Sequence, residues 1–434
     1  MNIILLSGGS GKRLWPLSNE VRSKQFIKVF KNKGEKESMV QRIYRQIKSV
    51  DSGAMVTIAT SKTQISAIHN QVGDDIDVSV EPSRRDTFPA IVLATAYLHD
   101  VKGISEDEAV VVCPVDPYVD DEYFKCLKKM SDQAMKGENA LVLMGINPTY
   151  PSEKYGYIIP QERDKGPIFK EKPRESLAEE YIKQGALWNG GVFAYKISYV
   201  LNKAKEILGM NQYDELYEKY ESLKKISFDY AVVEQELSIG IVKYSGQWKD
   251  LGTWNTLTAA MSERSSGNVI MSDNCESVNI INELDIPILA MGLKNLVIAA
   301  GPDGILVSDK DESSYIKPYV DKIDQQVMFA EKSWGSYKVI DVGEKSLTIK
   351  INIKAGENMN YHSHDRRDEV WTVVRGRGRT IVDGMEQVIK AGDVITMAAG
   401  CKHMVIADTE LEMIEVQLGE DISVKDKHKY EIDL

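Results

Sequence analysis

The sequence predicts an α/β fold for about the first 260 residues and a β-rich remainder. In the first part, short apolar runs alternate with longer amphipathic stretches, the pattern of β-α units that build a sheet with helices on both faces. Beyond residue 262, the apolar runs are short and broken by Asn, Asp and Gly, which is typical of strands joined by turns. The expected strands of the first part are Ile3–Leu6, Met55–Thr60, Ala109–Cys113 and Ala140–Met144, and the expected helical segments include Met39–Ser49 and Phe88–Leu98.

The composition limits the partners of the chain. Its 434 residues predict two or three domains, and its content of 43% hydrophobic and 27% charged residues is ordinary for a globular protein. The net charge of −11 argues against a nucleic-acid partner and against a membrane surface, so an anionic substrate must meet a local cluster of Lys and Arg. The four cysteines are scattered, and we see neither a signal peptide nor a membrane-spanning run. We therefore expect a cytoplasmic protein.

The first predicted strand runs directly into a glycine-rich turn, Ser7–Leu17. Such a turn brings backbone N–H groups close to a bound phosphate, and Lys12 and Arg13 add positive charge there. The turn is not a P-loop, because Leu6 and Arg13 stand where that motif needs Gly and Ser or Thr. It is not a dinucleotide-binding fingerprint either, because Leu14 occupies the place of the third Gly.

This turn and Ser23-Lys24-Gln25-Phe26 after it resemble the signature of sugar-1-phosphate nucleotidylyltransferases. The closest resemblance is to mannose-1-phosphate guanylyltransferases of the long, two-domain type. It implies a Rossmann-like, mixed-sheet nucleotidyltransferase domain of the GT-A-like kind. Ser23 replaces the family's proline, whereas Lys24 keeps its charge. The implied nucleotide-binding residues are Ser7, Gly8, Gly9, Gly11 and Lys12, and the implied catalytic cations are Arg13 and Lys24.

The stretch Glu81–Ala90 resembles the motif E-P-x-x-R-N-T-x-P-A of the same family, which lines the nucleotide side. The resemblance implies that Arg85 and Thr87 contact the nucleotide. Asp86 replaces the family's Asn, and a carboxylate only accepts hydrogen bonds where an amide also donates. The base therefore stays open between GTP and the other nucleoside triphosphates.

Two aspartates are expected to hold Mg²⁺. Asp116 follows the predicted strand Ala109–Cys113, at the sheet edge where ligands bind, and carboxylates are suitable ligands for Mg²⁺. Pro117 departs from the Asp-His pair that is common in the family. The stretch Trp248–Trp254 resembles the family motif W-x-D-x-G-[ST]-W, which implies that Asp250 is the second ligand, and both aspartates are implied to be catalytic.

Three further motifs resemble the sugar-phosphate side of the family. A Gly-Tyr pair stands at Gly156, F-x-E-K-P at Phe169–Pro173, and W-N-[SG]-G-x-F at Trp188–Phe193. A fourth stretch, Phe228–Glu234, resembles a family segment that packs around the same pocket. The implied sugar-phosphate ligands are Gly156, Glu171, Lys172 and Asn189.

The segment after residue 262 resembles the family's short β connector. Ser265–Asn268 indicates the boundary, and no hexapeptide repeat persists, so a long β-helix is not expected. Glu312–Gln326 has the pattern of a polar helix interrupted at Pro318. We predict a nucleotidyltransferase domain over residues 1–262, the connector and helix over 263–328, and an all-β barrel over 329–434.

The last hundred or so residues carry the spacing of the two cupin motifs. Gly356, His362, His364, Glu369 and Gly376 match the first motif, and Gly392, Gly400 and His403 match the second. His362 and His364 lie two positions apart on a strand and so share one face. The expected ligands of a second metal, Zn, Mn or Fe, are His362, His364, Glu369 and His403.

The resemblance implies transfer of a nucleotidyl group to a hexose-1-phosphate, with release of pyrophosphate. We expect GTP and mannose-1-phosphate as substrates, GDP-mannose as product and polysaccharide biosynthesis as its use. In bifunctional relatives the cupin isomerises mannose-6-phosphate, but its motif is altered here, for example Asp365 and Arg366 for two His, so efficient isomerase activity is not expected. The main alternative is a bifunctional enzyme that also interconverts mannose-6-phosphate and fructose-6-phosphate. Another NTP or sugar phosphate and a non-catalytic nucleotide-sugar sensor are the remaining alternatives. We expect a homo-oligomer, a dimer, with no nucleic-acid or membrane partner.

Overall fold

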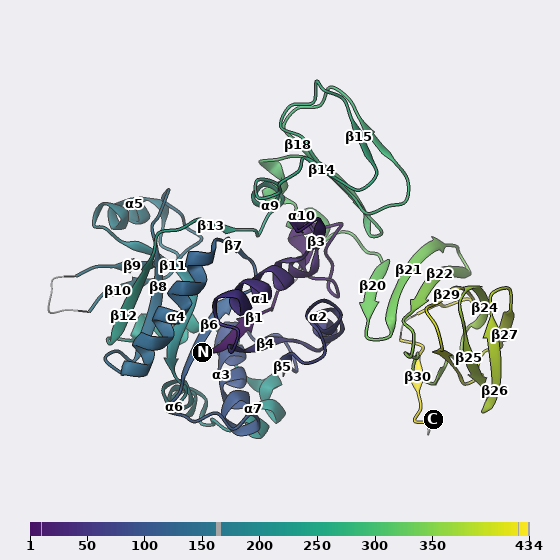
Figure 1. Ribbon diagram of the computed structural model, residues 1–434, viewed down its shortest axis with the longest axis horizontal. Helices are drawn as coiled ribbons and strands as arrows, with labels where there is room; N and C mark the ends of the chain where they lie inside the picture. Colours follow the sequence, from purple (N-terminus) through teal and green to yellow (C-terminus); the bar gives the residue numbers. More distant parts are fainter. Residues whose placement is uncertain (10, 162–165, 424, 433–434) are drawn as a thin grey trace. The chain divides into compact units, whose positions relative to one another are not determined.

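The computed structural model describes residues 1–9, 11–161, 166–423 and 425–432 (Figure 1). Its contacts divide the chain into two compact units. The first unit comprises Met1–Ser10 and Gln25–Ser262, and the second comprises Gly11–Lys24 and Glu263–Leu434. A short segment near the start of the chain, Gly11–Lys24, therefore packs with the C-terminal part.

A nine-stranded mixed sheet forms the centre of the first unit, as predicted. The strands β6, β1, β4 and β5 run parallel to one another, whereas β11 runs antiparallel to β6 and β8. The strand order is β10-β9-β11-β6-β1-β4-β5, and β8 pairs with β11 and β12. The strands are β1 (Asn2–Leu6), β4 (Met55–Ser61), β5 (Asp77–Glu81), β6 (Ala109–Pro114), β8 (Leu141–Ile146), β9 (Tyr157–Ile159), β10 (Ile168–Lys170), β11 (Leu187–Lys196) and β12 (Ile239–Tyr244).

The two faces of this sheet carry separate hydrophobic cores. Ile3 and Leu5 pack into one core, and Ile4 between them packs into the other, because successive side chains of a strand point to opposite faces. Helices α1 and α4 contribute to the first core, and α3 and α6 contribute to the second, which confirms helices on both faces. No helix of the described residues is long and apolar enough to cross a membrane. The helices are α1 (Met39–Val50), α2 (Ile65–Val72), α3 (Thr87–Ala96), α4 (Asp121–Lys136), α5 (Glu175–Lys183), α6 (Ile197–Leu208), α7 (Tyr213–Glu218), α8 (Phe228–Ala231) and α9 (Trp254–Thr258).

Two small strand pairs complete the first unit. The hairpin of β2 (Phe30–Asn32) and β3 (Glu35–Glu37) precedes α1. The strands β7 (Pro117–Val119) and β13 (Trp248–Asp250) pair antiparallel beyond the end of β6. This second pair joins two distant parts of the chain at the edge where the site residues are expected.

The β connector of the second unit consists of short sheets. β16 pairs parallel with β14 and β18, β15 pairs parallel with β17, and β19 closes an antiparallel hairpin with β18. The connector strands are β14 (Ser265–Ser266), β15 (Val269–Met271), β16 (Asn279–Asn282), β17 (Ile288–Ala290), β18 (Leu296–Gly301) and β19 (Gly304–Asp309).

The predicted helix over Glu312–Gln326 is wrong in extent. The structure has a 3-10 turn at Glu312–Tyr315 and a single-turn helix α10 (Lys317–Val320). Pro318 lies in the first turn of α10, where its missing N–H has no helical partner to lose, so it starts a helix instead of interrupting one.

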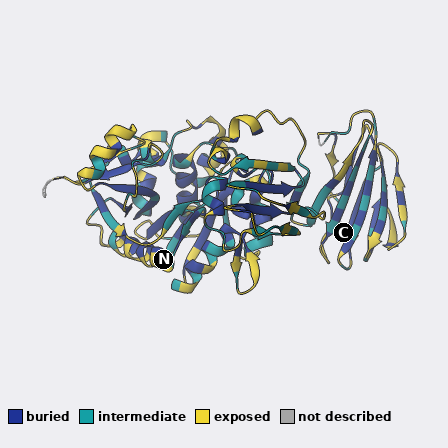
Figure 2. Cartoon of the chain, turned by 90° about the horizontal axis from the view of Figure 1, so that it is seen from above, coloured by how far each residue is buried: buried dark blue, intermediate teal, exposed yellow. Residues whose placement is uncertain are grey.

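The C-terminal part is a barrel of two facing sheets, ordered β20-β21-β22-β29-β24-β27 and β26-β25-β28-β23-β30. Figure 2 shows buried residues alternating with less buried ones along these strands, and in β22 buried and half-buried residues alternate regularly. The predicted all-β cupin-like fold is confirmed. The strands are β20 (Phe329–Lys332), β21 (Gly335–Val342), β22 (Ser346–Ile353), β23 (His362–Ser363), β24 (Asp368–Arg375), β25 (Arg377–Val382), β26 (Met385–Lys390), β27 (Val394–Met397), β28 (His403–Ala407), β29 (Leu411–Leu418) and β30 (His428–Lys429).

Candidate active site

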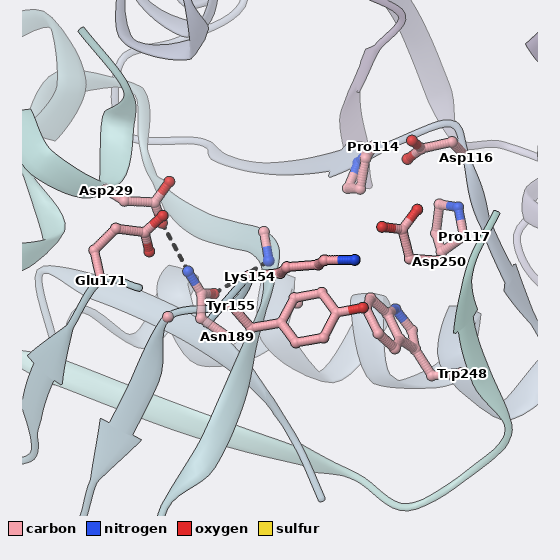
Figure 3. Close-up of a pocket in the computed structure, with 13 residues that line it drawn as sticks. Pro114, Asp116, Pro117, Lys154, Tyr155, Glu171, Asn189, Asp229, Trp248 and Asp250 are labelled. Atoms are coloured by element: carbon pink, nitrogen blue, oxygen red, sulfur yellow. Dashed lines mark hydrogen bonds between the residues drawn. The ribbon is translucent and has the colours of Figure 1, made fainter. Parts of the chain in front are cut away.

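A cavity of about 210 Å³ opens in the first unit beyond the carboxyl end of β6 (Figure 3). Ligands of such sheets bind at this edge. Five of the predicted site residues line the cavity: Asp116, Gly156, Glu171, Asn189 and Asp250. Among the other lining residues, sequence reasoning did not assign the polar and aromatic side chains of Lys154, Tyr155, Asp229 and Trp248.

Pairing of β7 with β13 brings the two predicted metal ligands together. Asp250 lies opposite Pro117 in this pair, and Asp116 directly precedes Pro117. Both carboxylates therefore lie at one end of the cavity (Figure 3). Oxygen donors of this kind fit Mg²⁺. Proline is tolerated at position 117 because it is the first residue of a short strand.

The other end of the cavity presents hydrogen-bonding groups. Gly156 lies so close to Glu171 that an added Cβ would be 2.6 Å from its carboxylate oxygen. The Gly156 carbonyl accepts from the Asn189 backbone N–H at 2.8 Å, which fixes Asn189 beside it. The Asn189 side chain donates to Asp229 at 2.7 Å and accepts from the Gly191 N–H at 3.2 Å. These polar groups converge in a pattern that suits a ligand rich in hydroxyl groups.

Asp229 is the site residue that sequence reasoning missed most clearly, although its motif was recognised. Burial and, to a smaller extent, the negative charge of Glu171 raise the pKa of Asp229 to about 7, against the opposing effects of Lys172 and of the hydrogen bond from Asn189. Asp229 and Glu171 face each other at this end of the cavity (Figure 3). One carboxyl of this pair therefore takes up a proton near neutral pH.

An aromatic cluster lies beside the carboxylates. The Tyr155 ring lies 4.8 Å from the Trp188 ring and 5.4 Å from the Trp248 ring, measured between centroids. Burial raises the pKa of the Tyr155 hydroxyl, and the charges of Asp250 and Asp116 add to the effect, so the phenol stays protonated. The cluster gives the cavity one apolar wall and a hydroxyl donor near the metal ligands.

The lysine that lines the cavity is Lys154, whereas the family motif indicated Lys172. Lys154 lines the cavity, and its side chain extends across the cavity in the direction of Asp250 (Figure 3). The predicted phosphate ligand Lys172 is not among the described lining residues, and its ammonium contacts Glu171 instead. Burial lowers the pKa of Lys172, but the contact with Glu171 outweighs it and raises the pKa.

In the glycine-rich turn, some residues support the fold and others expose their backbone. Ser7 is fully buried, and its carbonyl and hydroxyl both accept from the Gln25 side chain at 3.1 Å. Gly8 and Gly9 are exposed, and no atom lies within 4 Å of an added Cβ at either position. Gly9 has a φ of +135°, which L side chains rarely adopt. Ser7 therefore supports the turn, whereas Gly8 and Gly9 present backbone to a ligand.

The remaining cations of the signature lie in the second unit. Gly11 leaves no room for a Cβ, which would be 2.7 Å from the Asn19 carbonyl oxygen. Lys12 forms an ion pair with Asp321 at 3.1 Å, whereas the Arg13 side chain is exposed and Lys24 is half-buried. Arg13 is therefore the most accessible of these three cations.

The predicted nucleotide residues near α3 are held by the protein itself. The Thr87 hydroxyl accepts from the Phe228 N–H at 2.9 Å, and Asp86 caps α3 by accepting from the Thr87 N–H at 2.8 Å. The Nε of Arg85 is buried and has no hydrogen-bond partner among the described residues. Arg85 is thus the predicted nucleotide ligand of this segment with unsatisfied hydrogen-bonding capacity among the described residues.

A second candidate site lies in the barrel, where His362, His364, Glu369 and His403 are each 2% exposed. Their ligand atoms all lie within 4.8 Å of one another. Each histidine Nδ1 contacts a backbone carbonyl, which only accepts, so each Nδ1 carries the proton and each Nε2 keeps its lone pair. Buried Nε2 of His403 and Oε2 of Glu369 have no hydrogen-bond partner in the described chain. The donor set fits a divalent metal.

Charged groups surround this cluster. The buried Arg367 donates to Glu369 at 3.1 Å, and its Nη2 is 3.0 Å from the His364 Nε2. Burial, and then the charge of Glu369, raise the pKa of Glu415 to about 8. Sequence reasoning did not assign Glu415, because nothing in β29 distinguishes it from an outward-facing acid.

Comparison with known proteins gives two family matches. Residues 2–266 match the family described as Nucleotidyl transferase. Residues 321–431 match the family described as Mannose-6-phosphate isomerase C-terminal.

Relatives align with nearly the whole chain. A mannose-1-phosphate guanylyltransferase of Salmonella montevideo is 28% identical over 98% of both chains. The alginate biosynthesis protein AlgA of Pseudomonas aeruginosa is 26% identical over 99% of this chain and 96% of its own. A crystal structure from Thermus thermophilus, named mannose-1-phosphate geranyltransferase, is 30% identical with a TM-score of 0.61, covering 74% of this chain and 98% of that one.

Proposed function

Because the chain belongs to the nucleotidyl transferase family, we propose that it catalyses the Mg²⁺-dependent reaction of GTP with mannose-1-phosphate. The products are GDP-mannose and pyrophosphate. One observation supports this most directly: a single cavity joins two carboxylates at one end to hydroxyl-reading groups at the other. The full-length relatives named mannose-1-phosphate guanylyltransferase support the choice of substrates.

The proposed reaction needs positioning and charge neutralisation more than proton transfer. The attacking oxygen belongs to a phosphate that is already ionised, so no general base is required. Asp116 and Asp250 would hold Mg²⁺, which when bound neutralises charge on the phosphate oxygens. Glu171, Asn189 and the Gly156 backbone orient the hexose, and Asn189 also holds Asp229 in place.

The cations of the site divide between the two substrates. We assign Arg13 and Lys24 to the triphosphate, with the backbone of Gly8, Gly9 and Gly11. Lys12, Arg85 and Thr87 complete the proposed nucleotide contacts. For the sugar phosphate we retain Lys172 and add Lys154, because Lys154 lines the cavity whereas Lys172 contacts Glu171.

A second candidate function is isomerisation of mannose-6-phosphate in the barrel. The convergent Nε2 atoms of His362, His364 and His403 with Glu369 favour it, as does the family match of residues 321–431.

The four cysteines are unpaired, which fits a reducing compartment such as the cytoplasm.

Pyrophosphate release from four NTPs against a panel of sugar-1-phosphates tests the proposal. We expect a maximum with GTP and mannose-1-phosphate, and Asp116→Ala should abolish it while mannose-1-phosphate still binds. A maximum with another pair would keep the chemistry and change the specificity, and no release with any pair would favour a sensor. Conversion of mannose-6-phosphate to fructose-6-phosphate, lost in His364→Ala, tests the second candidate.

A further inference from the structure

The segment Gly11–Lys24 packs on the tip of the β18–β19 hairpin, far from it in sequence but in the same unit. Gly301 and Gly304 face each other across the two-residue turn of this hairpin. An added Cβ on Gly301 would be 2.9 Å from Leu17, and one on Gly304 would be 2.5 Å from Trp15. Both glycines are needed for the close approach between hairpin and segment.

Asn19 acts as a clamp within the segment. Its side-chain oxygen accepts from the backbone N–H groups of Val21 at 2.9 Å and Arg22 at 2.7 Å. The backbone N–H of Asn19 donates to the Arg22 carbonyl at 2.8 Å, which closes the turn from residue 19 to residue 22. The side-chain amide then donates to Asp303 at 2.7 Å. The orientation of this turn therefore depends on Asp303.

Asp303 belongs to the hairpin tip and is 6% exposed. One of its carboxylate oxygens accepts from Asn19, and the other accepts from the Met328 N–H at 2.8 Å. Its carbonyl accepts from the Gln325 side chain at 2.6 Å. A buried acid with both oxygens engaged holds its partners in fixed directions.

A second acid of the connector holds the same turn. Glu283 accepts from both terminal nitrogens of Arg22, at 2.6 and 3.0 Å, in a two-point ion pair. The guanidinium also lies over the Phe329 ring at 5.5 Å. Asp303 and Glu283 thus fix consecutive parts of the stretch between Arg13 and Lys24.

We propose that Asp303 and Glu283 of the β connector are positioning residues for the transfer reaction, because they fix the turn between Arg13 and Lys24. This inference rests on the proposed function, in which those two cations serve the triphosphate. Neither acid is among the described residues that line the transferase cavity. The connector is then part of the catalytic apparatus and not only a spacer. A misplacement of about 1 Å in such cations is enough to cost much of the rate.

Exchange of donor and acceptor tests this proposal. In Asp303→Asn, one of the two oxygens becomes an NH₂ group that faces a donor, either Asn19 or the Met328 N–H. In the double variant Asn19→Asp/Asp303→Asn, the residue at 303 donates to the residue at 19, and the acceptors for Val21, Arg22 and Met328 remain. Only the long bond from the Asn19 amide to the Phe329 carbonyl, at 3.4 Å, is lost. The single variant should lower kcat about tenfold with little change in KM for GTP, and the double variant should recover it.

The same hairpin offers a matched control. Asp309, at its other end, accepts from the Asn295 side chain at 2.8 Å and from the Asp311 N–H at 2.8 Å, and it makes none of the described contacts with Gly11–Lys24. Asp309→Asn should leave kcat unchanged. An equal loss of kcat in Asp309→Asn and Asp303→Asn would overturn the proposal, as would failure of the double variant to recover.

Amide hydrogen exchange gives a readout that does not depend on turnover. Exchange at Val21 and Arg22 should become about tenfold faster in Asp303→Asn and return to the wild-type rate in the double variant. Unchanged exchange overturns the proposal even if kcat falls. If the wild type shows no turnover while exchange responds as expected, the proposed function fails and with it the catalytic role of this contact, but the clamp itself stands.

Discussion

Asp86 illustrates how one replaced side chain is used by the local backbone. Its φ is 70°, and its carboxylate accepts from the Thr87 N–H at the start of α3. Asparagine supplies the same acceptor and tolerates positive φ as well as aspartate does. Either residue can therefore cap α3, and we infer no change of base from the replacement.

The first prediction follows from this capping role. Asp86→Asn should keep the wild-type ranking of the four NTPs and change the free energy of unfolding by less than about 0.5 kcal/mol. Asp86→Ala loses the cap and should lower that free energy by about 1 kcal/mol. Pyrophosphate release and urea unfolding measure the two effects. A changed base preference in Asp86→Asn would show instead that this side chain reads the nucleotide.

The second prediction concerns Asp229, whose pKa is raised to about 7 by burial and by Glu171. This pKa lies above the ordinary value of 3.8, so between about pH 4 and 7 the folded state holds a proton that the unfolded chain has released. The free energy of unfolding should therefore fall as pH rises through that range. Asp229→Asn should remove this slope. It should also remove a change near pH 7 in KM for mannose-1-phosphate. Unfolding and steady-state kinetics from pH 5 to about 8 give both slopes, and Asp214→Asn on exposed α7 is the control.

At the scale of elements, short strand pairs and turns assemble the candidate site. β7 and β13 have three residues each, yet their pairing joins Asp116 to Asp250. The tip of the β18–β19 hairpin likewise supports the signature segment through two glycines and Asp303. These small elements are held in place by close packing more than by their own pairing energy.

The third prediction measures that packing. Gly304→Ala should lower the stability of the second unit by about 2–3 kcal/mol, because an added Cβ would meet Trp15 at 2.5 Å and because φ at this position is +144°. Gly384→Ala is the matched control. Gly384 also lies in a hairpin turn at a φ of +81°, but it has open space, so only the conformational cost of about 1 kcal/mol remains. Equal losses in the two variants would mean that the contact with Trp15 contributes nothing.

Local patterns predicted much of the fold and part of the site. The alternation of apolar runs predicted β1, β4, β6 and β8, because each run is buried in the sheet and bounded by turn residues. The position after a strand end led to Asp116, and the resemblance to family motifs led to Gly156, Glu171, Asn189 and Asp250. Lys154 and Asp229 were missed, because a charged residue that lines a cavity has the same local sequence pattern as one that faces solvent. The packing of Gly11–Lys24 on the hairpin tip depends on contacts between residues that are distant in sequence. The periodicity of apolar residues does not predict such contacts.

At the scale of the whole molecule, two candidate sites lie in two separate units, and each has its own donor chemistry. The first has two carboxylates, which suit a hard cation such as Mg²⁺, and the barrel has three imidazoles and a carboxylate, which suit Zn, Mn or Fe. Metal exchange at one site should therefore leave the other unchanged. The buried imidazoles also link metal binding to the stability of the barrel.

The last prediction uses that link. Burial lowers the pKa of His362 to about 2, so its ring stays neutral at pH 7 and its Nε2 is ready for a metal. A metal that binds only the folded barrel should stabilise it by about 3–4 kcal/mol at a hundred to a thousand times its Kd, equivalent to roughly 12–20 °C in Tm for a barrel of about a hundred residues. Chelation should remove this increment from the wild type. His403→Ala should start at the lower Tm and be insensitive to chelator, with the bound metal counted by elemental analysis.

GDP-mannose synthesis with added Mg²⁺ should be the same in both proteins, because no residue of the barrel cluster lines the transferase cavity as described. A wild-type Tm that ignores the chelator, in protein shown to contain the metal, would mean that the four side chains do not hold it.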